Sequence, residues 1–416
     1  MREIRLAVVL APFVLFAACT RDKPEEPKAG PESKQETQFA PATAAAPEEV
    51  KIGQTMPYSG PASAYGTIGR VQAAYFKKIN DEGGVNGRKL NLISLDDAYS
   101  PPKTVEQVRR LVEQEKVAFV FNSVGTAANS AVHKYLNTKQ VPQLFVSTGA
   151  TKWGDPQNHP WTIGFNPTYQ LEGKTYAKHI LANRPKAKIA VLYQNDDYGK
   201  DLLHGLKEGL GDKAKKMIVA ESTYEVSDAT VDSQIATLAG SKADTFVNIA
   251  TPKFAAMALR RIHDTGWKPF HYLNQVGASI TSVIMPAGPE KAVGALTIGY
   301  FKDPNDPQYA NDPATQRYRE FMKKYYPEGD PKDGTNTYGY IAAQVAVQVL
   351  KQCGSDVSPQ NIMKQAASLK DFAPEMLLDG ITMNTSPTDF FPFDQVQMVK
   401  FNGKNWEPQG EVIKVD

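Results

Sequence analysis

The side chains of this chain that could do chemistry are hydrogen-bonding groups in short loops, without a recognisable catalytic pair among them. Each of these loops directly follows a stretch that is expected to be a strand. Open parallel sheets bind ligands in the crevice at the carboxyl ends of their strands, so loops in this position are expected to face one site. Hydroxyl, amide and backbone groups there can hydrogen-bond a small ligand. The loops are Ser59–Pro61, Asn122–Thr126, Ser147–Thr151, Asn195–Tyr198, Thr251–Pro252 and Gln275–Gly277.

Two series of alternating strands and helices must position these loops. Alternating βαβ units of this length imply parallel sheets covered by helices on both faces, and two series imply two doubly wound lobes of an α/β protein. The predicted strands are Val50–Tyr58, Lys89–Leu95, Val117–Phe121, Pro142–Ser147, Lys188–Tyr193, Met217–Tyr224, Thr245–Ile249 and His271–Asn274. The predicted helices are Ile68–Glu82, Thr104–Glu115, Gly199–Leu210, Val231–Ala239, Phe254–Thr265 and Ile341–Leu350.

Composition excludes several classes of protein. A length of 416 residues suits two lobes better than one core. The 47 basic residues nearly balance the 45 acidic ones, so no nucleic-acid partner is expected. Cys19 and Cys353 cannot build a disulfide framework, and neither a metal site nor a cofactor is predicted. The six histidines are scattered, and there is no Walker loop or strand-following GxGxxG, so the chain is predicted not to be an enzyme.

The N-terminus has the pattern of an export signal. Arg2 and Arg5 precede an apolar run, Leu6–Ala18, which is shorter than a membrane-spanning helix requires. The segment Leu15–Cys19 (LFAAC) resembles the bacterial lipobox, and that resemblance implies cleavage before Cys19 and lipidation of its thiol. An ordinary signal peptide with an incidental cysteine and a retained membrane anchor are the competing interpretations. We assign residues 1–18 to a signal peptide.

Residues 19–49 are predicted to be a lipidated cysteine followed by a disordered tether. Five prolines stand there among Glu, Lys, Ala, Ser and Thr, and almost nothing in this stretch could fill a core. A tether behind a lipidated residue lets a folded domain stand off the membrane. The predicted location is the periplasm, with the chain attached to an inner or outer envelope membrane.

Several motifs of the folded part resemble the leucine/isoleucine/valine-binding proteins, a family of type I periplasmic solute-binding proteins. The order and spacing of these motifs carry the resemblance, which extends over residues 50–416. The matching stretches are Ser59–Gly66 (SGPASAYG), Ile79–Leu90 (INDEGGVNGRKL), Asp96–Asp97, Pro101–Val112, Phe145–Thr151 (FVSTGAT) and Val191–Lys200 (VLYQNDDYGK).

The resemblance implies a bilobal protein with three hinge crossings, which catches a ligand between its lobes and delivers it to an ABC permease and ATPase. Lobe one is predicted to comprise residues 50–166 and 301–377, and lobe two residues 167–300 and 378–416. Backbone N–H groups around Gly149–Thr151, with the hydroxyls of Ser123 and Thr151, would suit a carboxylate. The predicted ligand-binding residues are Tyr65, Ser123, Gly149, Ala150, Thr151, Asn195, Tyr198, Thr251 and Gln275.

One departure from the family concerns the ligand itself. Amino-acid-binding members place an acid after a strand of the second lobe to pair the ligand's ammonium, whereas this chain has Gln275 and Val276 there. A desolvated ammonium without a counter-charge costs several kcal/mol. An apolar or aromatic carboxylate, an amide or a lipid-like molecule is therefore favoured over a free amino acid. Asp196 or Asp197 could supply the missing charge, or could simply cap the helix that follows.

Two further roles suit a bilobal protein of this kind. The same fold could serve as a ligand-sensing receptor that signals to a partner instead of a permease, or as a branched-chain amino-acid binding protein. The aromatic stretch of Trp153, Trp161 and Phe165 favours core packing near the hinge over a ligand-lining wall. Tyr338 and Tyr340, which open a helix, also favour core packing.

Overall fold

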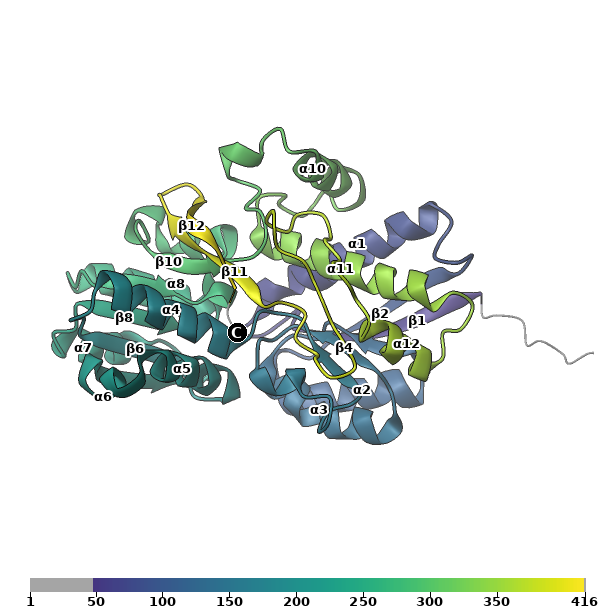
Figure 1. Ribbon diagram of the computed structural model, residues 1–416, viewed down its shortest axis with the longest axis horizontal. Helices are drawn as coiled ribbons and strands as arrows, with labels where there is room; N and C mark the ends of the chain where they lie inside the picture. The colour runs from purple at the N-terminus through teal and green to yellow at the C-terminus, as the bar shows by residue number, and fades with distance from the viewer. Residues whose placement is uncertain (1–47, 415–416) are drawn as a thin grey trace, which may run out of the picture. The chain divides into compact units, whose positions relative to one another are not determined.

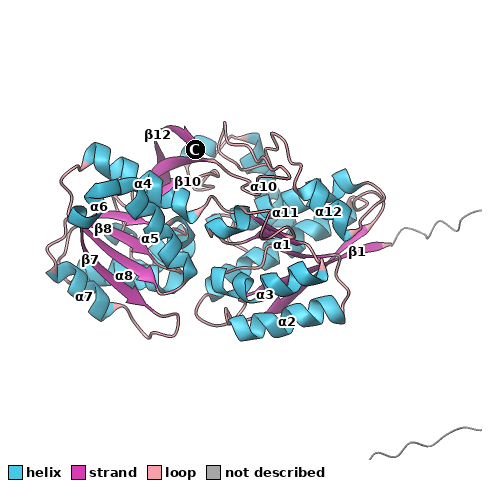
Figure 2. Ribbon diagram, turned by 60° about the horizontal axis from the view of Figure 1, so that its bottom comes forward, coloured by secondary structure: helices cyan, strands magenta, loops and turns pink. Residues whose placement is uncertain are grey.

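The computed structural model describes residues 48–414, so the predicted signal peptide, Cys19 and nearly all of the predicted tether lie outside the described residues. The chain divides into two units, Met1–Ala45 and Ala46–Asp416, and the second unit contains all of the described residues. Two sheets organise this unit, and each of them is covered by helices on both faces (Figure 1 and Figure 2). The predicted fold class of two doubly wound lobes is confirmed.

The first lobe is built on a five-stranded parallel sheet in the order β2-β1-β3-β4-β5. Alternating residues of β3 point to opposite faces, because the side-chain period of a strand is two. Phe119 and Phe121 pack with the larger core, whereas Val120 packs with the smaller one. The strands are β1 (Glu49–Met56), β2 (Lys89–Asp96), β3 (Phe119–Phe121), β4 (Gln143–Val146) and β5 (Thr162–Gly164).

Helices from two distant parts of the sequence cover this sheet. The helices α2 (Pro101–Glu113) and α3 (Thr126–Lys139) supply Leu111 and Leu136 to the smaller core. On the opposite face, α1 packs beside α11, whose residues enter the chain more than 250 positions later. The helices of that face are α1 (Gly66–Asp81), α10 (Pro313–Tyr325), α11 (Gly334–Cys353) and α12 (Pro359–Ala366).

The second lobe contains a seven-stranded sheet in the order β12-β11-β10-β9-β8-β6-β7. Five of its strands are parallel: β6 (Ile189–Gln194), β7 (Ile218–Tyr224), β8 (Thr245–Ile249) and β9 (Phe270–Leu273), which were predicted, and β10 (Leu296–Gly299), which was not. The prediction of a purely parallel sheet is wrong at one edge. There β11 (Gln395–Phe401) and β12 (Trp406–Lys414) form an antiparallel hairpin beside β10, because a short turn at Asn402–Asn405 reverses the chain.

The helices of the second lobe also divide between the two faces of the sheet. Ile189 and Val191 of β6 pack with α4 (Tyr169–Asn183) and α5 (Asp197–Leu210), whereas Ala190 and Leu192 pack with α7 (Asp232–Gly240) and α8 (Pro252–Asp264). The short α6 (Ala214–Met217) and α9 (Met285–Ala287) lie in connections. The α4–α5 pair is very close: a Cβ on Gly173 would lie 2.4 Å from the backbone nitrogen of Leu206.

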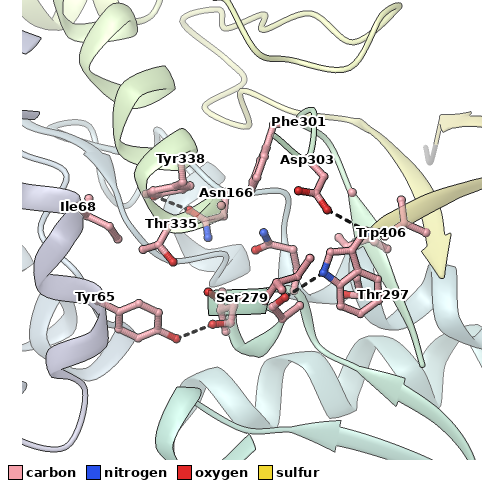
Figure 3. Close-up of a pocket in the computed structure, with 18 of the residues that line it drawn as sticks. Tyr65, Ile68, Asn166, Ser279, Thr297, Phe301, Asp303, Thr335, Tyr338 and Trp406 are labelled. Atoms are coloured by element: carbon pink, nitrogen blue, oxygen red, sulfur yellow. Dashed lines mark hydrogen bonds between the residues drawn. The ribbon is translucent and has the colours of Figure 1, made fainter. Parts of the chain in front are cut away.

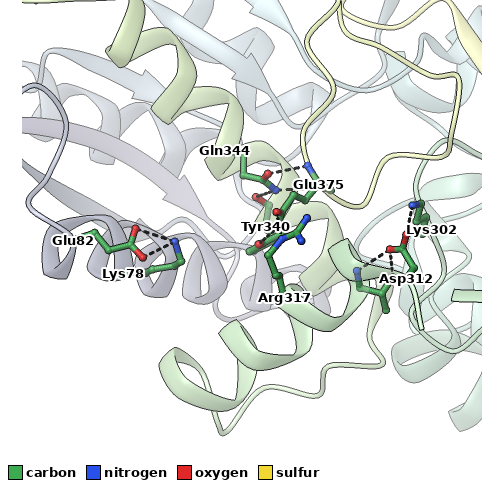
Figure 4. Close-up of polar contacts among 9 residues, drawn as sticks. Lys78, Glu82, Lys302, Asp312, Arg317, Tyr340, Gln344 and Glu375 are labelled. Carbon is green, nitrogen blue, oxygen red and sulfur yellow. Dashed lines mark hydrogen bonds and ion pairs between the residues drawn. The ribbon is translucent and has the colours of Figure 1, made fainter. Parts of the chain in front are cut away.

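The chain passes between the two sheets three times, after β5, after β10 and before β11. The second and third crossings are bridged where Phe301 pairs antiparallel with Leu377. Ion pairs flank these crossings: Glu375 binds Arg317 of α10 and the hydroxyl of Tyr340, and Lys302 binds Asp312 (Figure 4). These contacts fix the connecting segments to the first lobe.

The segment 378–394, which the sequence assigned to lobe two, packs elsewhere. Its buried Ile381, Met383, Phe390 and Phe393 belong to the core cluster of the first lobe, and the chain rejoins the second sheet only at β11. The ring of Phe393 lies 5.8 Å from that of Phe165, centroid to centroid. Phe165 and Trp153 are themselves fully buried in the two cores, in agreement with the core-packing interpretation.

Candidate functional site

A cavity that is partly open to solvent is lined by residues of both lobes (Figure 3). Its wall is rich in aromatic rings and hydroxyl groups, and Asp303 and Lys332 are the charged residues of the lining. From the first lobe it receives residues of α1, α11 and the loops after the strands, including Tyr65, Ile68, Tyr99, Val124, Ser147, Asn166, Thr335 and Tyr338. From the second lobe it receives Tyr169, Tyr198, Thr251, Gln275, Val276, Ser279, Thr297 and Trp406.

Four of the residues predicted from the sequence meet in this cavity: Tyr65, Tyr198, Thr251 and Gln275. The hydroxyl of Tyr65 donates a hydrogen bond of 2.8 Å to the carbonyl oxygen of Val276, so it bridges the two lobes. Tyr198 is 2% exposed, and its hydroxyl has no hydrogen-bond partner among the described residues. A buried hydroxyl without a partner is costly, which makes Tyr198 a candidate for a ligand contact.

The other five predicted residues lie outside the lining of this cavity. The hydroxyl of Ser123 accepts a hydrogen bond from the backbone N–H of Thr55 at 3.0 Å. The side chain of Asn195 donates to Glu225 at 2.6 Å. Gly149, Ala150 and Thr151 form the loop after β4, but side chains of the second lobe pack against this loop.

The hinge side of the cavity carries Asn166 and Tyr338, which the sequence did not indicate as ligand-binding residues, beside Ser147 of a predicted loop. The hydroxyl of Tyr338 donates to Oδ1 of Asn166 at 2.9 Å and lies 2.7 Å from Oγ of Ser147. Asn166 follows β5, and that strand has three residues, too few to show a periodic pattern. Tyr338 was predicted to be a core residue; it is 6% exposed and also contributes to the cavity wall.

The outer part of the cavity is framed by Trp406 of the antiparallel hairpin. Its indole N–H donates to the carbonyl of Ala278 at 3.0 Å, and its backbone N–H donates to Asp303 at 3.0 Å. Asp303 also accepts hydrogen bonds from Asn305, and burial raises the pKa of its carboxyl. Because β11 and β12 were not predicted, this wall of the cavity could not be predicted either.

A buried acid lies directly behind the cavity wall. Glu172 of α4 is 2% exposed and accepts hydrogen bonds from the backbone N–H of Gln275 at 2.7 Å and from the hydroxyl of Tyr176 at 2.5 Å. Burial raises the pKa of Glu172 to about 7. Glu172 lies in the first turn of a helix, where acids are common on protein surfaces. The sequence therefore contained no indication that this acid is buried behind the cavity wall.

Asp196 and Asp197 do not take the place of the missing acid in the lining. Asp196 caps α5 by accepting from the backbone N–H of Gly199 at 3.2 Å, as the helix-capping interpretation predicted. Asp197 forms an ion pair of 2.8 Å with Lys152 of the first lobe. Both carboxylates therefore have structural partners.

A cavity between two doubly wound lobes that the chain crosses three times defines a bilobal ligand-binding protein. Residues 49–404 match the family model described as "Periplasmic binding protein". The chain belongs to this family, in its type I, leucine/isoleucine/valine-binding branch. Membership implies a periplasmic or otherwise extracytoplasmic location and a role in binding a substrate. Among residues 48–414, none of the helices is both long enough and apolar enough to cross a membrane.

Relatives and solved structures agree with this assignment. The chain is 26% identical over 389 residues to Leu/Ile/Val-binding protein homolog 7 of Brucella abortus (strain 2308), covering 90% of this chain and 92% of that protein. It shares the fold of a branched chain amino acid ABC transporter protein from Thermus thermophilus with bound valine (TM-score 0.79, 17% identity, 88% and 97% of the two chains). It also shares the fold of a fatty acid ABC transporter substrate-binding protein from Thermomonospora curvata (TM-score 0.74, 21% identity, 89% and 93%).

Proposed function

We propose that this protein captures a small organic ligand between its lobes and delivers it to an ABC-type importer. The observation that carries the proposal is the cavity lined by both lobes, across which Tyr65 bonds to Val276. A ligand that contacts both walls stabilises the closed arrangement relative to an open one, which is the basis of hinge closure in bilobal proteins. The Thermus and Thermomonospora proteins are both described as parts of ABC transporters, which supports the importer as partner.

The ligand is proposed to be an apolar or aromatic carboxylate, an amide or a lipid-like molecule in preference to a free amino acid. Aromatic rings such as Tyr99, Phe301 and Trp406 dominate the wall and suit an apolar body. Among the residues that the structure describes, Asp303 is the single acid of the lining, and its oxygens already accept hydrogen bonds from N–H groups of Trp406 and Asn305. An amino acid's ammonium would therefore be buried without a free carboxylate, at a cost of several kcal/mol.

Native mass spectrometry of the purified protein tests the proposal by showing whether a small molecule is retained. Calorimetry with leucine, valine, aromatic acids, amides and lipid-like acids then ranks the ligand classes. Leucine is expected to bind weakly, with a Kd on the order of millimolar, because each 1.4 kcal/mol or so costs tenfold in affinity. Micromolar leucine binding would favour a branched-chain amino-acid binding protein instead. Small-angle scattering should show a smaller radius of gyration with the bound ligand than without it.

We also propose that the mature chain is attached to a bacterial envelope membrane through lipid on Cys19. The proposal rests on the sequence alone, namely on the lipobox-like segment Leu15–Cys19 and the proline-rich stretch behind it. The structure does not describe Leu15–Cys19 or nearly all of that stretch. A lipid anchor would keep the binding protein close to a membrane-embedded importer.

A further inference from the structure

The loop after β4, whose backbone the sequence assigned to a ligand carboxylate, is covered by Tyr169. The ring of Tyr169, the first residue of α4, lies directly on Gly149: a Cβ on Gly149 would be 2.8 Å and 2.9 Å from two of its ring carbons. The backbone N–H of Tyr169 donates to the carbonyl of Gly149 at 2.7 Å. Only glycine, which has no side chain, allows the ring to come this close, so the contact with Tyr169 depends on Gly149.

Other polar groups of the same loop are also engaged within the protein. The hydroxyl oxygen of Thr148 lies 2.6 Å from that of Thr126, the first residue of α3, and it accepts a hydrogen bond from the backbone N–H of Ala150 at 3.2 Å. Burial raises the pKa of Tyr169 to about 12, so its phenol is neutral near pH 8. The backbone N–H of Ala150 is therefore already hydrogen-bonded inside the loop.

A carboxylate of the protein itself binds Thr151, the last residue of the loop. Oδ2 of Asp201 accepts from the backbone N–H of Thr151 at 2.7 Å and from its hydroxyl at 2.9 Å. Oδ1 of Asp201 accepts from Gln170 at 2.7 Å. Asp201 lies on α5 of the second lobe, so the donors predicted for a ligand carboxylate are used to join the lobes.

The remaining part of the cavity offers neutral groups. Among residues 48–414, the lining contains no arginine or histidine, and its one cation, Lys332, is exposed. The groups left for a ligand's polar end include the unpartnered hydroxyl of Tyr198 and the side chain of Asn166, which is 8% exposed. A buried carboxylate needs charge-assisted or multiple N–H donors, whereas an amide is satisfied by a few neutral ones.

We propose that Tyr169 and Asp201 are specificity-determining residues that occupy the carboxylate-binding loop with the protein's own groups, so that the cavity takes an uncharged amide with an apolar or aromatic body. The proposal rests on the proposed ligand-binding function and narrows it, since it excludes the carboxylates from the proposed ligand classes.

Matched pairs of acid and amide test this narrowing. Phenylacetate with phenylacetamide, and octanoate with octanamide, are titrated calorimetrically into the full mature protein at about pH 8, where the acids are ionised. The amide of at least one pair is expected to bind about tenfold or more tightly than its acid. Tyr169→Ala should uncover the backbone of Gly149 and raise the affinity for the acid by about tenfold. Tyr309→Ala, which removes another phenol of the lining, is the control and should give no such gain.

Asp201→Asn provides a second variant with an unchanged side-chain shape, in case Tyr169→Ala does not fold. Removal of its negative charge from Thr151 should also increase the affinity for the acid, severalfold. A wild-type protein that binds acid as tightly as amide, or variants that bind amide but gain nothing for the acid, would overturn the inference while the proposed function stands. If neither member of any pair binds and the purified protein carries no small molecule, both the inference and the proposed function are contradicted.

Discussion

Replacing Glu172 by Gln should remove a pH dependence from the stability of the second lobe. In the folded state the carboxyl is buried behind the cavity wall, and its pKa is raised from 4.5 to about 7. The folded state therefore holds this proton more tightly than the unfolded state does. Stability is highest below the unfolded-state pKa and falls as the pH rises through the window from 4.5 to about 7.

The size of the effect follows from the shift. A difference of one pKa unit corresponds to about 1.4 kcal/mol, so ionisation of Glu172 lowers the free energy of unfolding by about 3 kcal/mol across this window. Gln cannot ionise, yet its amide oxygen can accept the hydrogen bonds from Gln275 and Tyr176 that Glu172 accepts. Glu172→Gln should therefore match the wild type in acid and exceed its stability by about 3 kcal/mol at about pH 8.

Urea unfolding followed by tryptophan fluorescence, repeated between about pH 4.5 and pH 8, measures this difference. Burial lowers the pKa of His271 to about 3, so His271 makes stability rise with pH over part of the same range. This contribution is the same in variant and wild type and cancels when the two free energies of unfolding are subtracted. The charge of Glu172 raises the pKa of four phenols, which all stay protonated throughout this pH range. They are those of Tyr169, Tyr176, Tyr198 and Tyr300. A difference that stays constant with pH would refute the reasoning.

Three further perturbations address other parts of the chain. Tyr65→Phe removes the hydrogen bond to Val276 between the lobes and should weaken ligand binding, measured by calorimetry, about fivefold. The free energy of unfolding of each lobe should not change, because the bond lies between the lobes and not within either of them. Gly173→Ala places a methyl group against the backbone of α5 and should cost about 2 kcal/mol in urea unfolding, whereas Gly240→Ala, with no atom within 4 Å of the new Cβ, should cost little. Cys19→Ala should move the protein from the membrane fraction to the soluble periplasmic fraction of cells, and an unchanged distribution would contradict lipidation.

Local periodicity predicted much of the fold correctly. The strand Thr245–Ile249 was predicted with the bounds that the structure shows, and the helix over 199–210 differs from α5 by two residues at its start. The features that escaped prediction include the three-residue β5, the antiparallel hairpin of β11 and β12, and the packing of 378–394 with the first lobe. The hairpin itself is local, but its place beside β10 depends on a partner far away in the sequence, as do β5 and the packing of 378–394. A window of neighbouring residues contains no signal for such partners.

The sequence by itself determined which residue types stand after each strand, because turns and strand ends are set by neighbouring residues. This was enough to bring Tyr65, Tyr198, Thr251 and Gln275 to one cavity. Only the tertiary structure decided in which of those loops hydrogen-bond donors stay available to a ligand. Gly149 and Thr151 have the right chemistry for a carboxylate, yet Tyr169 and Asp201 pack onto them from helices of the other lobe. The availability of a donor depends on every group that folding brings against it, and those groups lie up to 50 residues away along the chain.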